Sequence, residues 1–68
     1  MLSEYLKRRR RDAGQTQLEA AREVGVSGQT WSNWERDRTR PNREALGRLA
    51  RWAGVSVDDL YKRIVATT

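Results

Sequence analysis

Residues 17–36 read QLEAAREVGVSGQTWSNWER. Gly25 divides this stretch into two segments, and glycine adopts the left-handed backbone of a sharp turn without steric cost. Apolar residues recur at helical spacing on both sides of the glycine, and these are Ala20, Ala21, Val24, Trp31 and Trp34. The stretch therefore predicts two short helices that are joined by a tight turn and bury one side each.

Both segments carry signals for the start of a helix. Thr16 stands three residues before Glu19, which is the spacing of a capping box. Ser27 is a favourable N-cap, and we expect the second helix to begin there and to run to about Arg36. The side of this helix opposite the tryptophans is polar and nearly uncharged until its last turn. It carries Gln29, Ser32, Asn33 and Arg36, with Thr30 at its rim.

The residues before this pair predict a further helix over about residues 3–13. Leu2, Leu6 and Ala13 fall on one side of it at about 100° per residue. Gly14 is the glycine expected just past a helix C-terminus. The basic run in this helix wraps around the axis and forms no single basic face. The two arginines that flank the apolar side are Arg9 and Arg10.

The residues after the pair predict a loop over 37–41 and two more helices. Asn42 is the expected N-cap of the fourth helix and Gly54 its end. Ser56 and Asp59 have capping-box spacing at the start of the fifth. The apolar positions of these two helices are Ala45, Leu46, Leu49, Ala50, Ala53, Leu60, Tyr61 and Ile64. We expect residues 66–68 to fray. No stretch alternates as a strand does, so the sequence predicts an all-α fold.

The 68 residues are enough for one domain, which we expect to span residues 1–68. Lys and Arg total 14 against 9 Asp and Glu, a net charge of +5, and most of the basic residues are Arg. Arg is better suited than Lys to bidentate contacts with phosphate and guanine. The charge alone leaves two interpretations open, a nucleic-acid partner and an ordinary solvated surface.

Several classes of function are disfavoured by composition. The chain has no Cys and no His, so ordinary thiolate or imidazole metal sites and the commonest general base are missing. We expect no enzyme, no metal, no cofactor and no small-molecule substrate. No signal peptide and no apolar run of membrane-spanning length is visible, and we expect a cytoplasmic, nucleoid-associated protein without a membrane partner.

The motif at about residues 17–36 resembles the helix-turn-helix of the phage repressor and Cro family, also called the xenobiotic-response-element family. The match rests on Gln17, Ala21, Gly25, Trp31 and Trp34. Pro41 and residues 49–60 also fit the family pattern, and the resemblance covers about residues 6–61. The resemblance implies a five-helix, repressor-like domain. It also implies sequence-specific binding of double-stranded DNA by a transcriptional regulator, expected here to be a repressor. The recognition helix, at about residues 28–36, would lie in the major groove.

The sequence departs from the family pattern at several positions. Both packing positions of the recognition helix hold Trp in place of the usual aliphatic residue. Ala20 replaces a usual Leu while Leu18 replaces a usual polar residue, so we expect Leu18 to fill the space that Ala20 leaves. Trp52 and Ala53 show a similar exchange. Gly28 lacks the usual long polar side chain, so either one base contact is lost or the backbone approaches DNA more closely.

The resemblance assigns roles to the polar residues of the motif. Amides can donate to and accept from adenine in the major groove. The residues expected to contact bases are Gln29, Asn33, Ser32 and Gly28. Those expected to contact phosphates are Gln17, Ser27, Thr30, Arg36, Arg38, Arg40 and Arg43, although each arginine alone could equally be a free surface charge.

The resemblance also implies an ion pair between Arg10 and Glu35, which would fix the first helix relative to the third. The three tryptophans could in principle stack on bases. Their helical spacing favours packing in the core instead.

A protein-interaction module of the same fold, such as an antitoxin or a transcriptional coactivator, is the alternative function. An amide and hydroxyl surface on the recognition helix favours DNA over that alternative. The resemblance further implies a weak homodimer that forms on a two-fold related operator, through the region of residues 55–59.

Overall fold

The computed structural model describes residues 1–65, and that part of the chain contains five helices and no strand. The helices are α1 (Leu2–Asp12), α2 (Gln17–Val24), α3 (Gly28–Glu35), α4 (Arg43–Ala53) and α5 (Val57–Val65). This is the predicted all-α fold, with helix ends within one or two residues of those expected. The tail expected to fray, 66–68, lies outside the described residues.

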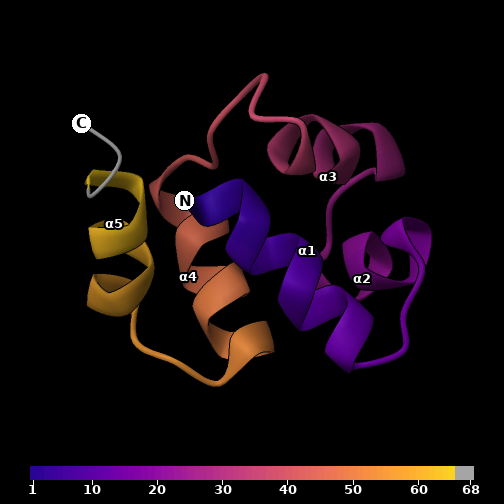
Figure 1. The fold of residues 1–68 in the computed structure, drawn as a ribbon, viewed down its shortest axis with the longest axis horizontal. Helices are drawn as coiled ribbons and strands as arrows, with labels where there is room; N and C mark the ends of the chain where they lie inside the picture. The colour runs from indigo at the N-terminus through magenta and orange to yellow at the C-terminus, as the bar shows by residue number, and fades with distance from the viewer. Residues whose placement is uncertain (66–68) are drawn as a thin grey trace.

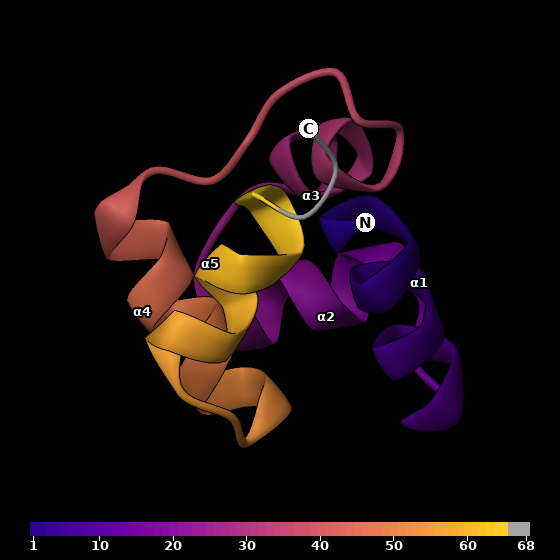
Figure 2. The same cartoon turned by 60° about the vertical axis from the view of Figure 1, so that its left-hand side comes forward.

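The helices surround one apolar core. Figure 1 shows α1 crossing the middle of the molecule, with α2 and α3 on one side of it and α4 and α5 on the other. In Figure 2, α5 comes forward, and it packs against both α4 and α1. Among residues 1–65, six residues have no exposed surface, and they come from every helix: Leu6, Ala20, Ala21, Trp31, Leu49 and Leu60. The apolar side of each helix therefore closes on the same interior.

Three tryptophans supply much of the bulk of this core. Trp31 is fully buried, and its ring packs edge-on against Trp52 at 5.1 Å and tilted against Trp34 at 5.9 Å between ring centroids. Such pairs add about 0.5–1.5 kcal/mol beyond the apolar area that they bury. The core interpretation of the tryptophans is confirmed for Trp31 and Trp34, which is 5% exposed. Trp52 is half-buried at its margin.

The predicted caps fix the helix ends. Thr16 and Glu19 form both hydrogen bonds of the capping box. The side chain of Asn42 accepts the Ala45 N–H at 2.8 Å, and that of Ser56 accepts the Asp59 N–H at 3.1 Å. Each bond satisfies a backbone donor that would otherwise lack a partner in the first turn of its helix.

The turn between α2 and α3 depends on Gly25. Its φ is +90°, and its N–H donates to the Ala21 carbonyl at 2.8 Å, closing the end of α2. A side chain at this position would adopt a strained left-handed backbone. Ala21, fully buried, lets α2 and α3 pack against each other. The predicted helix-turn-helix is therefore present.

Expectations about burial are wrong at three positions, and one of them is Tyr61, which is 58% exposed on α5. Ala13 is exposed because α1 ends at Asp12 and Ala13 is its C-cap, beyond the turns that face the core. Leu18 is 49% exposed and does not fill the space beside Ala20. Residues two apart on a helix point to nearly opposite sides, so Ala20 faces the core while Leu18 faces outward.

Candidate nucleic-acid interface

The orientation of α3 is set by its cap and by its tryptophans. The Ser27 hydroxyl oxygen accepts a hydrogen bond from the Thr30 N–H at 3.0 Å, and the Ser27 hydroxyl donates to the Thr30 hydroxyl oxygen at 2.9 Å. Trp31 and Trp34 point into the core. The opposite side of the helix is therefore held toward solvent.

Gln29 and Asn33 lie next to each other on that outer side. The Gln29 amide Nε2 donates to Asn33 Oδ1 at 3.1 Å, across one helical turn. Gln29 is exposed, whereas Asn33, Ser32 and Gly28 are half-buried. The two amides keep further N–H groups and the Gln29 carbonyl oxygen available to a partner. The structure thus brings together two amides that offer both donors and acceptors.

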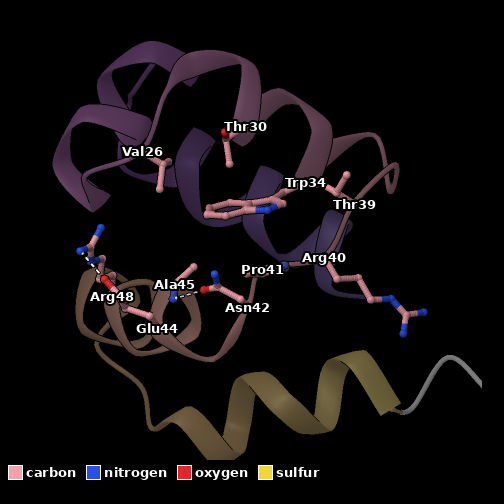
Figure 3. Close-up of a pocket in the computed structure, with 10 residues that line it drawn as sticks. All are labelled: Val26, Thr30, Trp34, Thr39, Arg40, Pro41, Asn42, Glu44, Ala45 and Arg48. Atoms are coloured by element: carbon pink, nitrogen blue, oxygen red, sulfur yellow. Dashed lines mark hydrogen bonds and ion pairs between the residues drawn. The ribbon is translucent and has the colours of Figure 1, made fainter.

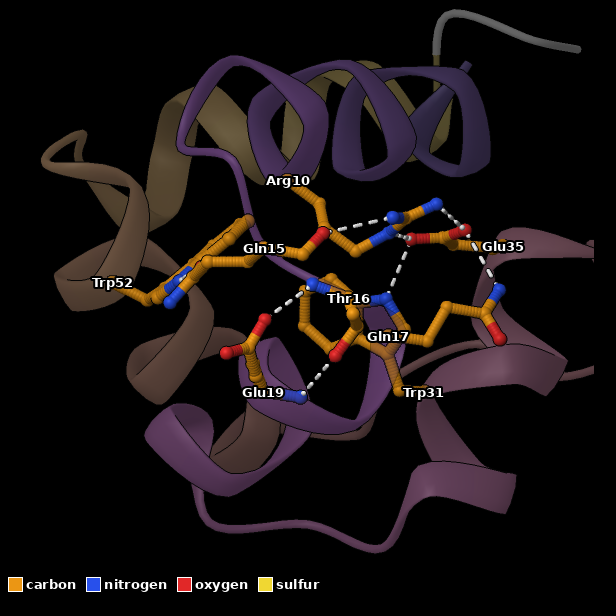
Figure 4. A network of polar contacts seen from close by, with 8 residues as sticks. All are labelled: Arg10, Gln15, Thr16, Gln17, Glu19, Trp31, Glu35 and Trp52. Carbon is orange, nitrogen blue, oxygen red and sulfur yellow. Dashed lines mark hydrogen bonds and ion pairs between the residues drawn. The ribbon is translucent and has the colours of Figure 1, made fainter.

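The carboxylate of Glu35, the last residue of α3, is the centre of a polar network that faces α1 and α2 (Figure 4). Arg10 donates to it from Nε at 2.6 Å and from Nη2 at 3.1 Å. The indole Nε1 of Trp31 donates at 2.5 Å and the amide Nε2 of Gln17 at 3.0 Å. The predicted pair of Arg10 and Glu35 is therefore present, and it joins α1 to α3 while Gln17 adds α2.

This network is almost sealed from water. The Glu35 side chain is 2% exposed and that of Arg10 is 14% exposed. Burial by itself raises the pKa of Glu35, but the hydrogen bonds from Arg10, Gln17 and Trp31 outweigh burial and hold that pKa below its ordinary value. The hydrogen bond to Glu35 raises the pKa of Arg10. Both groups are therefore charged in the folded protein.

Gln17 has an internal partner that the sequence did not reveal. The amide hydrogen given to Glu35 leaves a second hydrogen on Nε2. Gln17 is also the first residue of α2, where backbone N–H groups lack intrahelical partners. A phosphate contact by Gln17 would thus be made by a side chain already positioned by Glu35.

The four arginines expected to contact phosphates are exposed, and no salt bridge holds any of them among residues 1–65. They are Arg36, Arg38, Arg40 and Arg43. Arg36 caps the end of α3, and Asp37 turns the chain with a φ of +61°. The Arg38 N–H donates to the Asn33 carbonyl at 2.9 Å, which ties the start of the loop to the helix.

A polar groove lies between α3 and the start of α4, beside this loop (Figure 3). The Trp34 side chain lies between the two helices, and Pro41 is buried, which anchors the loop. The Arg40 side chain extends away from the groove in Figure 3. Its guanidinium is therefore presented outward.

Other arginines serve the packing of the helices. Arg9 donates to the Ala53 carbonyl at 2.8 Å, and Arg48 donates to the Gly25 carbonyl at 3.3 Å and pairs with Glu44. The Arg63 guanidinium lies 4.0 Å from the centre of the Tyr5 ring. Among residues 1–65, the four arginines around the loop after α3 have no such salt bridge.

Two members of the Glu35 network were missed by sequence reasoning. Trp31 and Glu35 are four residues apart, so their shared face on a helix was visible and could have suggested the indole hydrogen bond. The bond from Gln17 had no such signal because it crosses between helices. Trp52 likewise donates to Gln15 Oε1 at 3.2 Å across 37 residues of chain.

Two helices joined at a glycine turn, with a polar outer side on the second, define the helix-turn-helix class. None of the helices in the described residues is long and apolar enough to cross a membrane. The family model of the helix-turn-helix domain matches residues 1–61, and the chain belongs to that family. The resemblance to phage repressors is confirmed by the comparisons that follow.

Three known proteins are similar over most of the chain. The HTH-type transcriptional regulator ImmR of Bacillus subtilis (strain 168) is 39% identical over 59 residues, which is 87% of this chain and 46% of ImmR. The chain thus spans about half the length of that curated relative. The solution structure of the DNA-binding domain of the P22 C2 repressor has a TM-score of 0.81 and 35% identity, covering 91% of this chain and 82% of that domain. The structure of SinR, the master regulator for biofilm formation, in complex with DNA has a TM-score of 0.78 and 29% identity, with coverages of 90% and 98%.

Proposed function

We propose that this chain binds double-stranded DNA at a specific sequence and acts as a transcriptional repressor, with α3 in the major groove. The observation that carries the proposal is the amide pair of Gln29 and Asn33 on the outer side of a helix whose other side is fixed in the core. Relatives named as a transcriptional regulator and a repressor, and a structural neighbour solved with DNA, support it. Catalysis has no part in the proposal.

Base reading is assigned to the outer side of α3. Gln29 and Asn33 would bond base edges, with adenine as the favoured partner of an amide. Ser32 would contribute at the edge of the contact, and the backbone at Gly28 would approach the groove. Because these groups carry no charge, their contribution depends on the base sequence and not on salt.

Phosphate contacts are assigned to groups around α3. The exposed arginines Arg36, Arg38, Arg40 and Arg43 would neutralise phosphates beside the groove, and this contribution is independent of sequence. Gln17 would use its remaining amide hydrogen, and Ser27 and Thr30 would contribute their hydroxyl groups. These contacts would hold the duplex in register for the amides.

Two copies are proposed to meet on a two-fold related site. Val57 is 41% exposed and Tyr61 is 58% exposed, and both border a groove with Pro41 and Leu46. This groove adjoins the region of residues 55–59. Charged side chains also line it, and these are Arg40, Arg43 and Asp58. Half-sites would then lie about one helical turn of DNA apart.

The test is binding to a duplex selected from a random pool and to a scrambled duplex, each titrated at several salt concentrations. We expect the selected duplex to bind at least about 1,000-fold more tightly. The logarithm of affinity should fall with the logarithm of salt with a slope of about −4 for each bound copy, if its four arginines each neutralise one phosphate. Equal affinity for both duplexes, or no dependence on salt, would favour the protein-interaction alternative.

A further inference from the structure

Leu18 is a large apolar residue on the surface of the helix-turn-helix motif. It is the second residue of α2, and 49% of it is exposed. The other large exposed apolar residues of the described chain lie at its start or in α5. Leu18 is therefore isolated from them and faces solvent on the same motif as the amide pair.

Leu18 lies over the first residue of α3. A Cβ atom placed on Gly28 would lie 3.4 Å from Leu18 Cδ1. The Leu18 side chain thus lies in the space next to Gly28 that a side chain at position 28 would enter. The N-terminal residues of a recognition helix are the ones that reach base edges in the major groove.

We propose that Leu18 determines specificity by contacting the 5-methyl group of a thymine, in the place where Gly28 offers no side chain. The inference rests on the proposed function, because it requires α3 to lie in the major groove. The thymine methyl is the apolar group that base pairs present in that groove, and an apolar side chain discriminates it from the other bases. Leu18 and the amides of Gln29 and Asn33 would then read neighbouring bases by different chemistry.

The experiment replaces each thymine of the selected duplex in turn by deoxyuridine, which removes the methyl group and keeps the base pair. Wild type should lose about four-fold in affinity at one thymine per half-site, the loss expected for one buried methyl group. Leu18→Ala should bind the thymine and deoxyuridine duplexes equally at that position. The remaining thymines of the duplex serve as internal controls.

Two further measurements serve as controls for this comparison. Leu18→Met keeps an apolar tip at the same place and should retain the thymine preference within about two-fold. The circular dichroism spectrum of Leu18→Ala should match that of wild type, and its melting temperature should fall only slightly, because nearly half of the residue is already exposed.

The outcomes separate this inference from the proposed function. A contrary result is that wild type still prefers the selected duplex while every thymine-to-deoxyuridine change costs wild type and Leu18→Ala the same affinity. That result overturns the inference and leaves the proposed function standing. A selected duplex with no thymine in either half-site also overturns the inference. Equal binding of wild type to the selected and scrambled duplexes would contradict the proposed function itself.

Discussion

At the scale of the residue, the Glu35 carboxylate is where three helices meet. It accepts hydrogen bonds from Arg10 of α1, Gln17 of α2 and Trp31 of its own helix. Hydrogen bonds to a charged group contribute about 1.5–3 kcal/mol each, and an unpaired charge left in a dry site costs more than the bond that it loses. The position of α3 therefore depends on this one side chain.

Replacing Glu35 by Gln should show that dependence. The substitution keeps the shape but removes the charge opposite Arg10, whose side chain is only 14% exposed. We expect the free energy of unfolding, measured with urea, to fall by about 3 kcal/mol. Glu44→Gln is the matched control, because it breaks the exposed pair with Arg48 and should cost about 0.5 kcal/mol or less. Equal losses in the two variants would contradict the assigned role.

Stability should also respond to acid through the same residue. The folded-state pKa of Glu35 is lower than its ordinary value, so its contribution to stability is present above that ordinary value and is lost as pH falls through the folded-state pKa. Wild type should therefore lose more free energy of unfolding between about pH 5 and about pH 2 than Glu35→Gln does. Parallel pH profiles for the two proteins would show that Glu35 is not the group responsible.

At the scale of the element, the same substitution at two glycines should have opposite effects. Gly25 has a φ of +90°, and an added Cβ would lie 3.4 Å from Arg48 Nη1, so Gly25→Ala should destabilise the protein by about 1–2 kcal/mol. Gly47 lies within α4, and nothing lies within 4 Å of an added Cβ there. Gly47→Ala should stabilise the protein by about 0.5–1 kcal/mol. Thermal unfolding measures both, and a shared sign would refute the account of the turn.

The helix ends could be predicted from sequence because their signals are local. Thr16, Asn42 and Gly25 act on backbone groups within a few residues of themselves. The exposure of Leu18 could also be obtained from the sequence, because helical spacing places Leu18 nearly opposite Ala20, and the expectation from volume alone overlooked this. The bond between Gln17 and Glu35 depends on how α2 and α3 are placed relative to each other. Base and phosphate contacts, which need a partner, stay predictions.

At the scale of the whole molecule, exposed basic residues occur on α1, α2, α4 and α5 as well as around the end of α3, and only some of them have internal partners within residues 1–65. Arg9, Arg10 and Arg48 donate side-chain hydrogen bonds to other helices or turns. In this described part of the chain, no salt bridge holds the arginines around the end of α3, and they form an exposed group. The exposed group is available to phosphates, and the amide pair lies beside it.

The oligomeric state should change on DNA. Sedimentation of the protein alone at micromolar concentration should give a monomer or a weakly associating dimer, and a duplex with two half-sites should carry two copies. Tyr61→Ala should weaken the second binding event while leaving a single half-site unaffected. A tight dimer at nanomolar concentration without DNA would contradict this arrangement, as would a selected site with no repeated half.

The most direct test of the central claim compares Asn33→Ala with Arg38→Ala on a selected and a scrambled duplex at several salt concentrations. Asn33→Ala should weaken binding to the selected duplex by about 1–3 kcal/mol and leave the scrambled duplex almost unchanged. Arg38→Ala should weaken both duplexes similarly and reduce the salt slope by about one unit. If Asn33→Ala instead weakens both duplexes equally, α3 is not the element that reads the sequence, and the central claim is wrong.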